Sequence, residues 1–260
     1  MTTFATTPDR VRIAYEIAGE GPRTIVLVHG FASDRVQNWR APGWYQTLNG
    51  AGLRVIALDC RGHGESDKPH APKFYGHDKM AGDVIAVMDD AGIGEAVLMG
   101  YSMGGYIAMS LLLHHPERFS KVIIAGVGAS YLDIHAANEG TNDPSRRAAI
   151  ADALTVADPS TITNVTARNF RLFADQPGKD RLALAACMRG NRDSFTVEQL
   201  GTSTRPVLVV CGEKDDLTGP PGPLAAAFAE GRAVIVPNRD HMTAVGDKVY
   251  KQAVLDFLGL

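Results

Sequence analysis

Two kinds of apolar pattern alternate along this chain. Short continuous apolar runs have the length of buried strands, and longer segments repeat apolar residues at helical spacing. The runs predict strands at residues 11–18, 23–28, 53–59, 96–99, 121–125, 205–211 and 232–236. The helical pattern predicts helices at residues 44–51, 77–91, 102–115, 223–230 and 247–258. Such alternation predicts an α/β fold with a mostly parallel central sheet and helices on both of its faces.

The alternation stops after Val127. Residues 129–203 keep a helical pattern that proline-containing turns interrupt, at Asp143-Pro144, Asp158-Pro159 and Gln176-Pro177-Gly178. We therefore expect a helical cap at 129–203, inserted into a core that consists of residues 1–128 and 204–260. The cap is expected over the carboxyl ends of the strands, where open α/β sheets bind ligands.

A serine lies between two glycines where a predicted strand meets a predicted helix, in Gly100-Tyr101-Ser102-Met103-Gly104. A sharp strand-to-helix turn would force the serine into a strained conformation with its hydroxyl pointing outward. The residues two before and two after it must then be small, and Gly100 and Gly104 meet that demand. This pattern indicates a nucleophile elbow.

A serine hydroxyl needs an activating base and an orienting acid. Among eight histidines, His241 has the best position, because it follows the apolar run at 233–237 and precedes the last predicted helix. The acid is expected after an earlier strand, and the run at 206–211 leads into Gly212-Glu213-Lys214-Asp215-Asp216. Asp215 is the candidate acid, with Asp216 as the alternative. The order Ser102, Asp215, His241 is one that catalytic triads adopt.

These motifs together resemble the α/β-hydrolase superfamily, in its serine-nucleophile branch with a helical cap. Three further segments match it: Val26-Leu27-Val28-His29-Gly30-Phe31, the Asp-x-Arg-Gly-x-Gly-x-Ser loop at Asp59–Ser66, and the Gly-x-x-Asp loop that ends at Asp215. The resemblance implies an oxyanion hole formed by the amides of Phe31 and Met103. The sequence departs from the family pattern at Asp240, because members of the family often have glycine before the catalytic histidine. His29 and His63, beside glycines at strand ends, are more typical of structural residues than of bases.

The resemblance implies a serine hydrolase that cleaves carboxylic esters through an acyl-enzyme, as an esterase or carboxylesterase. Lactone, carbon–carbon bond or peracid hydrolysis on the same triad stays open as an alternative. A small-molecule receptor that retains the triad is a second alternative, from a different functional class. Substrate-binding candidates are the large side chains of the cap and of the loops beside the triad, namely Trp39, Tyr131, Phe170, Phe173, Leu217 and Met242.

The composition and charge of the chain exclude some classes of binding partner. The chain of 260 residues is 45% hydrophobic, and its 26 basic and 29 acidic residues leave a net charge of −3 with no basic stripe. Nucleic acid is therefore not an expected partner, and no apolar run has the length of a membrane span. Three scattered cysteines suggest buried thiols in a reducing cytoplasm. No histidine cluster has metal-ligand spacing, so we expect no metal. The resemblance implies a small-molecule ester as the substrate and no cofactor.

Overall fold

The computed structural model describes residues 1–132, 144–191 and 195–260. Its centre is one eight-stranded sheet with the strand order β1-β2-β4-β3-β5-β6-β7-β8. Strands β3 to β8 pair in parallel, whereas β1 pairs antiparallel with β2 and β2 antiparallel with β4. The predicted class, α/β with a mostly parallel central sheet, is confirmed. The strands are β1 (Thr3–Thr6), β2 (Arg12–Ala18), β3 (Arg23–Val28), β4 (Leu53–Leu58), β5 (Ala96–Tyr101), β6 (Phe119–Ala125), β7 (Val207–Gly212) and β8 (Gly231–Val236).

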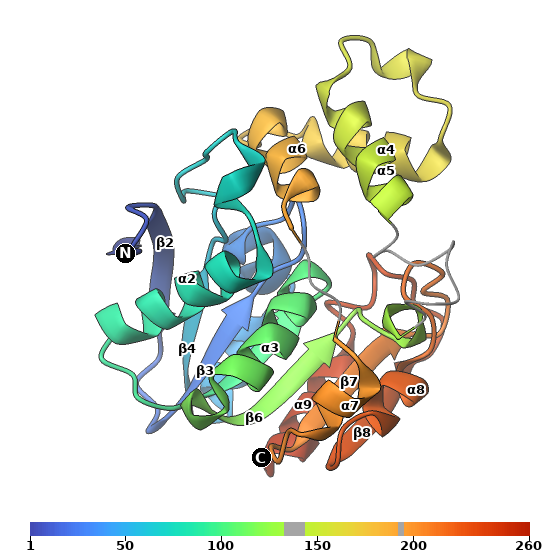
Figure 1. The fold of residues 1–260 in the computed structure, drawn as a ribbon. Coiled ribbons are helices and arrows are strands. Elements are labelled where there is room, and N and C mark those ends of the chain that lie inside the picture. The colour runs from blue at the N-terminus through green and yellow to red at the C-terminus, as the bar shows by residue number, and fades with distance from the viewer. Residues whose placement is uncertain (133–143, 192–194) are drawn as a thin grey trace.

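Helices surround the sheet and cover both of its faces (Figure 1). The described α-helices are α1 (Trp44–Gly50), α2 (His77–Asp90), α3 (Met103–His114), α4 (Pro144–Thr155), α5 (Val165–Ala174), α6 (Arg181–Arg189), α7 (Val197–Gly201), α8 (Pro221–Ala226) and α9 (Lys248–Leu258). Short π or 3₁₀ turns are η1 (Val36–Arg40), η2 (Pro72–Phe74), η3 (Pro116–Arg118), η4 (Ala129–Tyr131) and η5 (Pro159–Thr161). Among these helices, none is both long enough and apolar enough to cross a membrane.

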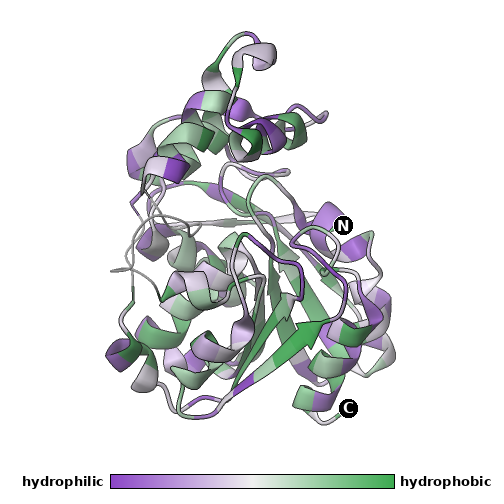
Figure 2. Cartoon of the chain, turned by 90° about the vertical axis from the view of Figure 1, so that its right-hand side faces the viewer, coloured by the Kyte–Doolittle hydropathy of each residue, from purple (hydrophilic) through white to green (hydrophobic). Residues whose placement is uncertain are grey.

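Two apolar cores lie on opposite faces of the sheet. Successive side chains of a strand point to opposite faces, so Val26 and Val28 of β3 join one core while Ile25 and Leu27 join the other. The first core is closed by side chains of α2, α3 and α8, and the second by those of α1 and α9. Figure 2 shows the central strands as the most hydrophobic part of the chain, which is expected for a sheet buried on both faces.

Helices α4, α5 and α6 form a separate layer at the upper end of the molecule in Figure 1, beyond the carboxyl end of β6. They belong to the segment for which a cap is predicted, of which residues 133–143 and 192–194 lie outside the described part. Two other elements of that segment pack lower down, because α7 contacts α3 and η4 contacts α8. The layer of α4 to α6 is therefore the part that lies over the strand ends.

The predicted elements agree with the structure except at the first strand and at the end of one helix. Strand β1 was not predicted from the pattern, because it has four residues of which only Ala5 is buried. It exists through its pairing with β2, from Thr3 opposite Tyr15 to Thr6 opposite Arg12. The helix predicted at 223–230 is α8, which begins at Pro221 and ends at Ala226, before β8 begins at Gly231.

Candidate active site

Ser102 occupies a strained turn between β5 and α3. Its backbone has φ 52° and ψ −114°, a region that L-residues rarely adopt. A Cβ on Gly100 would lie 2.0 Å from the carbonyl oxygen of Gly104, and one on Gly104 would lie 2.0 Å from that of Val28. The turn is held by a hydrogen bond of 2.7 Å from the Ser102 amide to the carbonyl of Ala125 on β6. Both glycines are therefore required by close backbone approach, as the sequence pattern predicts.

The structure brings Ser102, His241 and Asp215 together from three different loops. Nε2 of His241 lies 3.0 Å from Oγ of Ser102, and Nδ1 lies 2.8 Å from Oδ2 of Asp215. The other carboxylate oxygen of Asp215 accepts hydrogen bonds from the amides of Leu217 and Thr218. This network fixes the acid, the imidazole and the hydroxyl in one line, the arrangement that lets an imidazole remove a serine proton.

Asp216, the alternative acid, is exposed, while Asp215 is buried at 4% exposure. Asp216 lies on the wall of the cavity in front of the triad. The geometry therefore favours Asp215 as the partner of His241.

Tyr101 supports the histidine loop, and the sequence analysis gave it no role. Its buried hydroxyl donates a hydrogen bond of 2.6 Å to the carbonyl oxygen of His241, and its ring lies 5.6 Å from the imidazole. Burial raises the pKa of the Tyr101 phenol well above its ordinary value, so the hydroxyl stays a donor at neutral pH. Tyr101 thus holds the backbone of His241 against the strand that leads into Ser102.

Asp240 replaces the glycine that is frequent before the histidine in the superfamily. Its carboxylate accepts hydrogen bonds from the amides of Met242 and Thr243 and from the Thr243 hydroxyl, at 2.7 to 3.0 Å. These bonds lower the pKa of the Asp240 carboxyl, with the Thr243 hydroxyl as the largest cause. Asp240 therefore organises the turn that follows the base.

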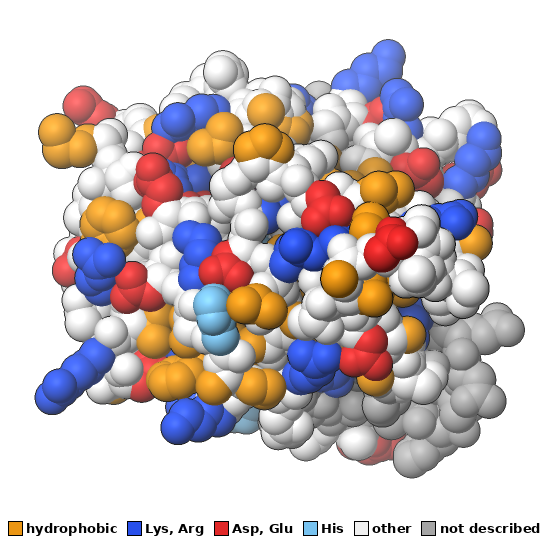
Figure 3. All heavy atoms as spheres, turned by 90° about the horizontal axis from the view of Figure 1, so that it is seen from above, with side chains coloured by type: hydrophobic (Ala, Val, Ile, Leu, Met, Phe, Trp, Pro, Cys, Tyr) orange, Lys and Arg blue, Asp and Glu red, His pale blue; other side chains and the backbone are white. Residues whose placement is uncertain are grey.

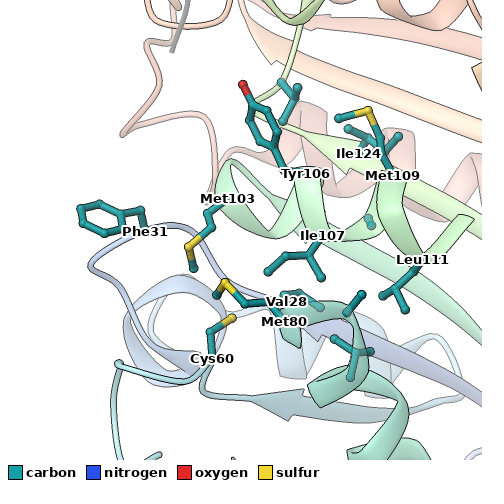
Figure 4. Packing of buried hydrophobic residues seen from close by; sticks show 14 of the residues in the cluster. Val28, Phe31, Cys60, Met80, Met103, Tyr106, Ile107, Met109, Leu111 and Ile124 are labelled. Atoms are coloured by element: carbon teal, nitrogen blue, oxygen red, sulfur yellow. The ribbon is translucent and has the colours of Figure 1, made fainter. Parts of the chain in front are cut away.

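The segment expected to form the oxyanion hole lies directly against the nucleophile. A Cβ on Gly30 would lie 3.4 Å from Cβ of Ser102. The loop is fixed by Asn38, whose Oδ1 accepts from the Gly30 amide at 3.1 Å, and by a contact of 2.7 Å between His29 Nδ1 and the Gly30 carbonyl. Met103 is the first residue of α3, so its amide lacks an acceptor within the helix. Figure 4 shows Phe31 and Met103 at one edge of the buried apolar cluster.

The Asp59–Ser66 loop has a structural role. The Asp59 carboxylate accepts from the amides of Arg35 and Glu65 and forms an ion pair with the Arg35 guanidinium. His63 is buried, its Nδ1 lies 2.9 Å from the Arg61 carbonyl, and its ring packs edge-on against Phe31. Burial lowers the pKa of His63 well below its ordinary value. These residues hold the loops behind Phe31 in place, in agreement with the structural role expected of His63.

A cavity of about 620 Å³ opens in front of Ser102 and His241. Four of the predicted substrate-binding residues line it, namely Phe170, Phe173, Leu217 and Met242. Polar side chains that the sequence analysis did not select also line it, namely Ser33, Gln37, Asn38, Thr166, Asn169 and Lys214. The volume lies within the range of about 300–1,000 Å³ that is usual for small-molecule sites.

The structure corrects the expectation for Trp39 and Tyr131. Trp39 is fully buried in the second core, where its ring packs against Trp44 at 6.1 Å and Tyr101 at 6.5 Å. Tyr131 is 1% exposed and its ring packs against Tyr106 at 4.7 Å. Neither residue is among the described residues that line the cavity. Both aromatic rings serve packing, which is a common role of large aromatic side chains in a core.

A bridge of polar side chains joins the upper layer to the core beside the cavity, which Gln37 and Phe173 line. Lys179 donates hydrogen bonds to the side-chain oxygens of Gln37 and Gln176, at 3.1 and 2.9 Å. Its ammonium group also lies 3.4 Å from the centre of the Phe173 ring, a cation–π contact. Partial burial lowers the pKa of Lys179 to about 8. Seen from above, the described part of the molecular surface carries interspersed acidic and basic side chains (Figure 3).

Comparison with known proteins places this chain in a family. A family model described as alpha/beta hydrolase fold matches residues 23–244. The chain is 31% identical over 258 residues, 94% of its length, to the dihydrolipoyllysine-residue acetyltransferase component of the acetoin cleaving system of Pseudomonas putida, of which it spans 65%. It is 32% identical to 3-oxoadipate enol-lactonase 2 of Acinetobacter baylyi, over 82% of this chain and 79% of that protein.

A solved structure of a hydrolase from Pseudomonas aeruginosa covers the whole chain with a TM-score of 0.81 and 25% identity. The match includes 98% of that protein. The similarity in sequence and the similarity in structure agree on the fold.

Proposed function

The chain belongs to the α/β-hydrolase family, and from this premise we propose that it hydrolyses carboxylic esters through an acyl-enzyme formed on Ser102. The observation that carries the proposal is the hydrogen-bonded line from Asp215 through His241 to Ser102, with bonds of 2.8 and 3.0 Å. It opens into a cavity of small-molecule size. The family, the similar enol-lactonase of Acinetobacter baylyi and the similar hydrolase of Pseudomonas aeruginosa support hydrolysis. The triad supports a serine nucleophile.

In the proposed acylation step, Nε2 of His241 takes the Ser102 proton while Oγ attacks the ester carbonyl carbon. The amides of Phe31 and Met103 stabilise the negative charge that develops on the carbonyl oxygen. Asp215 keeps Nδ1 protonated and stabilises the imidazolium. Collapse of the tetrahedral intermediate breaks the bond to the alcohol oxygen, which receives the proton from His241 and leaves as the alcohol.

Deacylation repeats these steps with water as the nucleophile. His241 takes a proton from water, the hydroxide attacks the acyl carbon, and the bond to Ser102 Oγ breaks as His241 returns the proton to the serine. The products are the carboxylic acid and the free enzyme. A metal or an organic cofactor has no part in this proposed sequence, since the three side chains, the ester and water account for every proton and electron pair.

Hydrolysis of lactones is a second candidate, because 82% of this chain resembles the enol-lactonase of Acinetobacter baylyi. A lactone is a cyclic ester, so the same two steps would open it. Comparison of kcat/KM for simple esters and for five- and six-membered lactones separates the two candidates. A receptor that retains the triad would show little turnover of either.

The substitution Ser102→Ala tests the nucleophile. We expect ester turnover to fall by at least ~10³-fold, because loss of one triad member disables the whole unit. Circular dichroism and the unfolding midpoint should stay close to those of the wild type. A fluorophosphonate probe should label the wild-type protein at Ser102 and leave the variant unlabelled. Label on a different serine, or a variant that keeps most of its activity, would refute the assignment.

A further inference from the structure

Two cavities of very different size meet at the nucleophile. The outer one, about 620 Å³, opens toward solvent, and the inner one measures about 40 Å³. Both are lined by the same five residues at their junction, namely Phe31, Ser102, Phe170, Leu217 and His241. A substrate whose reacting carbon is bonded to Ser102 would therefore extend one part into each cavity.

A pair of aromatic rings forms part of the boundary between the cavities. The centroids of Phe31 and Phe170 lie 5.8 Å apart at an interplanar angle of 62°, an edge-to-face contact. Phe31 belongs to the loop after β3, which is part of the core, and Phe170 belongs to α5 in the upper layer. Phe173 lies one turn further along α5. Of the two cavities, it lines only the outer one. The two phenylalanines of α5 therefore have different places relative to the junction.

The position of His241 indicates which part of an ester would enter each cavity. The leaving alcohol must lie next to Nε2 of His241, from which it takes its proton. The outer cavity is lined by three more residues of the histidine loop, Asp240, Met242 and Val245. The inner cavity is lined instead by Met103 and Tyr106 of α3, together with Arg146, Ile150 and Met188. This arrangement places the alcohol in the outer cavity and the acyl chain in the inner one.

Resting on the ester hydrolysis proposed above, we propose that the substrates are esters of short-chain acids with larger alcohols, and that Phe170 limits the length of the acyl chain. The inner cavity measures about 40 Å³ and the outer one about 620 Å³, so the acyl chain is the part of the ester whose length is limited. We take acids from acetic to butyric as the short chains that the inner cavity accepts. The outer cavity has room for an alcohol of drug-like size.

The test is a graded series of p-nitrophenyl esters, from acetate through butyrate and hexanoate to octanoate. For the wild type we expect kcat/KM to be greatest between acetate and butyrate and to fall at least ~10-fold from butyrate to octanoate. Where a chain does fit, each added methylene should raise kcat/KM about fourfold through burial. Acyl chains that end in a carboxylate are left out, because Arg146 would add a charge interaction to the effect of length.

The variants Phe170→Ala and Phe173→Ala form a matched pair on one helix. Phe170→Ala joins the two cavities and should raise the ratio of kcat/KM for octanoate to that for butyrate at least ~10-fold. Phe173→Ala enlarges only the outer cavity and should leave this ratio within about twofold. Met188→Ala enlarges the inner cavity from another helix and should shift the ratio in the same direction as Phe170→Ala, which covers the case in which Phe170→Ala fails to fold.

The proposal is overturned if the wild type prefers octanoate, or if the two phenylalanine variants change the ratio equally. It is also overturned if neither Phe170→Ala nor Met188→Ala changes it. All of these outcomes are measured as ester hydrolysis that the Ser102→Ala variant lacks. They would therefore contradict the assignment of the two cavities and not the proposed ester hydrolysis. Turnover that does not depend on Ser102 would contradict the proposed function instead.

Discussion

Asp215 and Asp216 are neighbours in the sequence, yet their side chains have different surroundings. Asp215 is buried and its two oxygens are used by His241 and by two backbone amides. Asp216 is exposed at the wall of the cavity. Neighbouring residues on an irregular loop point their side chains in different directions. Only one of the two carboxylates therefore reaches the imidazole.

Asparagine substitutions of these two carboxylates test the acid. Asp215→Asn should lower kcat/KM for a simple ester by at least ~10³-fold, because the amide favours the wrong imidazole tautomer. Asp216→Asn is the matched control and should change kcat/KM by less than ~5-fold. Initial rates for the two purified variants against the same ester decide the matter. The opposite order of effects would assign the acid to Asp216.

At the scale of elements, the joint between β5 and α3 depends on two glycines. Gly100 faces the carbonyl oxygen of Gly104 so closely that a Cβ would lie 2.0 Å from it. The contact is between backbone atoms, and it cannot be relieved by a side-chain rotation. Gly82, inside α2, has no heavy atom within 4 Å of the position a Cβ would take. The two glycines therefore differ in what an added methyl group would do.

Alanine substitutions at these glycines should have opposite effects on stability. Gly100→Ala should lower the free energy of unfolding by roughly 3 kcal/mol or more, because the strand and the helix must move apart. Gly82→Ala should raise it by roughly 0.5–1 kcal/mol, because alanine has the higher helix propensity. Urea denaturation followed by circular dichroism measures both. A Gly100→Ala protein within about 1 kcal/mol of the wild type would contradict the close packing described here.

At the scale of the whole molecule, the buried guanidinium of Arg61 joins three parts of the chain. It pairs with Asp83 of α2 at 2.6 Å, with Asp9 of the β1–β2 turn at 2.8 Å, and donates to the carbonyl of Phe74. Arg61 itself follows β4, so the network ties the antiparallel edge of the sheet to a helix. Hydrogen bonds from Arg61 lower the pKa of Asp9 from 3.8 to about 2.

This lowered pKa predicts a pH-dependent part of the stability. A carboxyl whose pKa is lower in the folded state stabilises the fold above its unfolded pKa, near 4. That contribution is lost as the pH falls toward about 2. Asp9→Asn should therefore be less stable than the wild type at pH 7, and the difference should shrink between pH 4 and pH 2. Urea denaturation at a series of pH values measures this difference.

The control is Asp152→Asn, which breaks an exposed ion pair with Arg189. It should change the free energy of unfolding by no more than about 1 kcal/mol. A difference between the wild type and Asp9→Asn that stays constant down to pH 2 would show that the pairing with Arg61 does not depend on the charge of Asp9.

The sequence by itself determined the fold class, most element positions and the elbow at Ser102. These features are encoded locally, because the spacing of apolar residues fixes which face of a strand or helix is buried. The two glycines around Ser102 are also a local signal, since a sharp turn needs small residues at fixed offsets. Strand β1 escaped prediction because its stability comes from a partner strand and hardly from its own burial.

Only the tertiary structure decided what lies around the triad. Trp39 and Phe170 are both large aromatic residues near the site in the sequence-based view, but one fills the core and the other lines both cavities. The choice of Asp215, the support from Tyr101 and the sizes of the two cavities likewise depend on residues far apart in the chain. The physical reason is that a side chain's direction and the volume left beside it are set by the packing of several elements together, which the local pattern of any one of them does not contain.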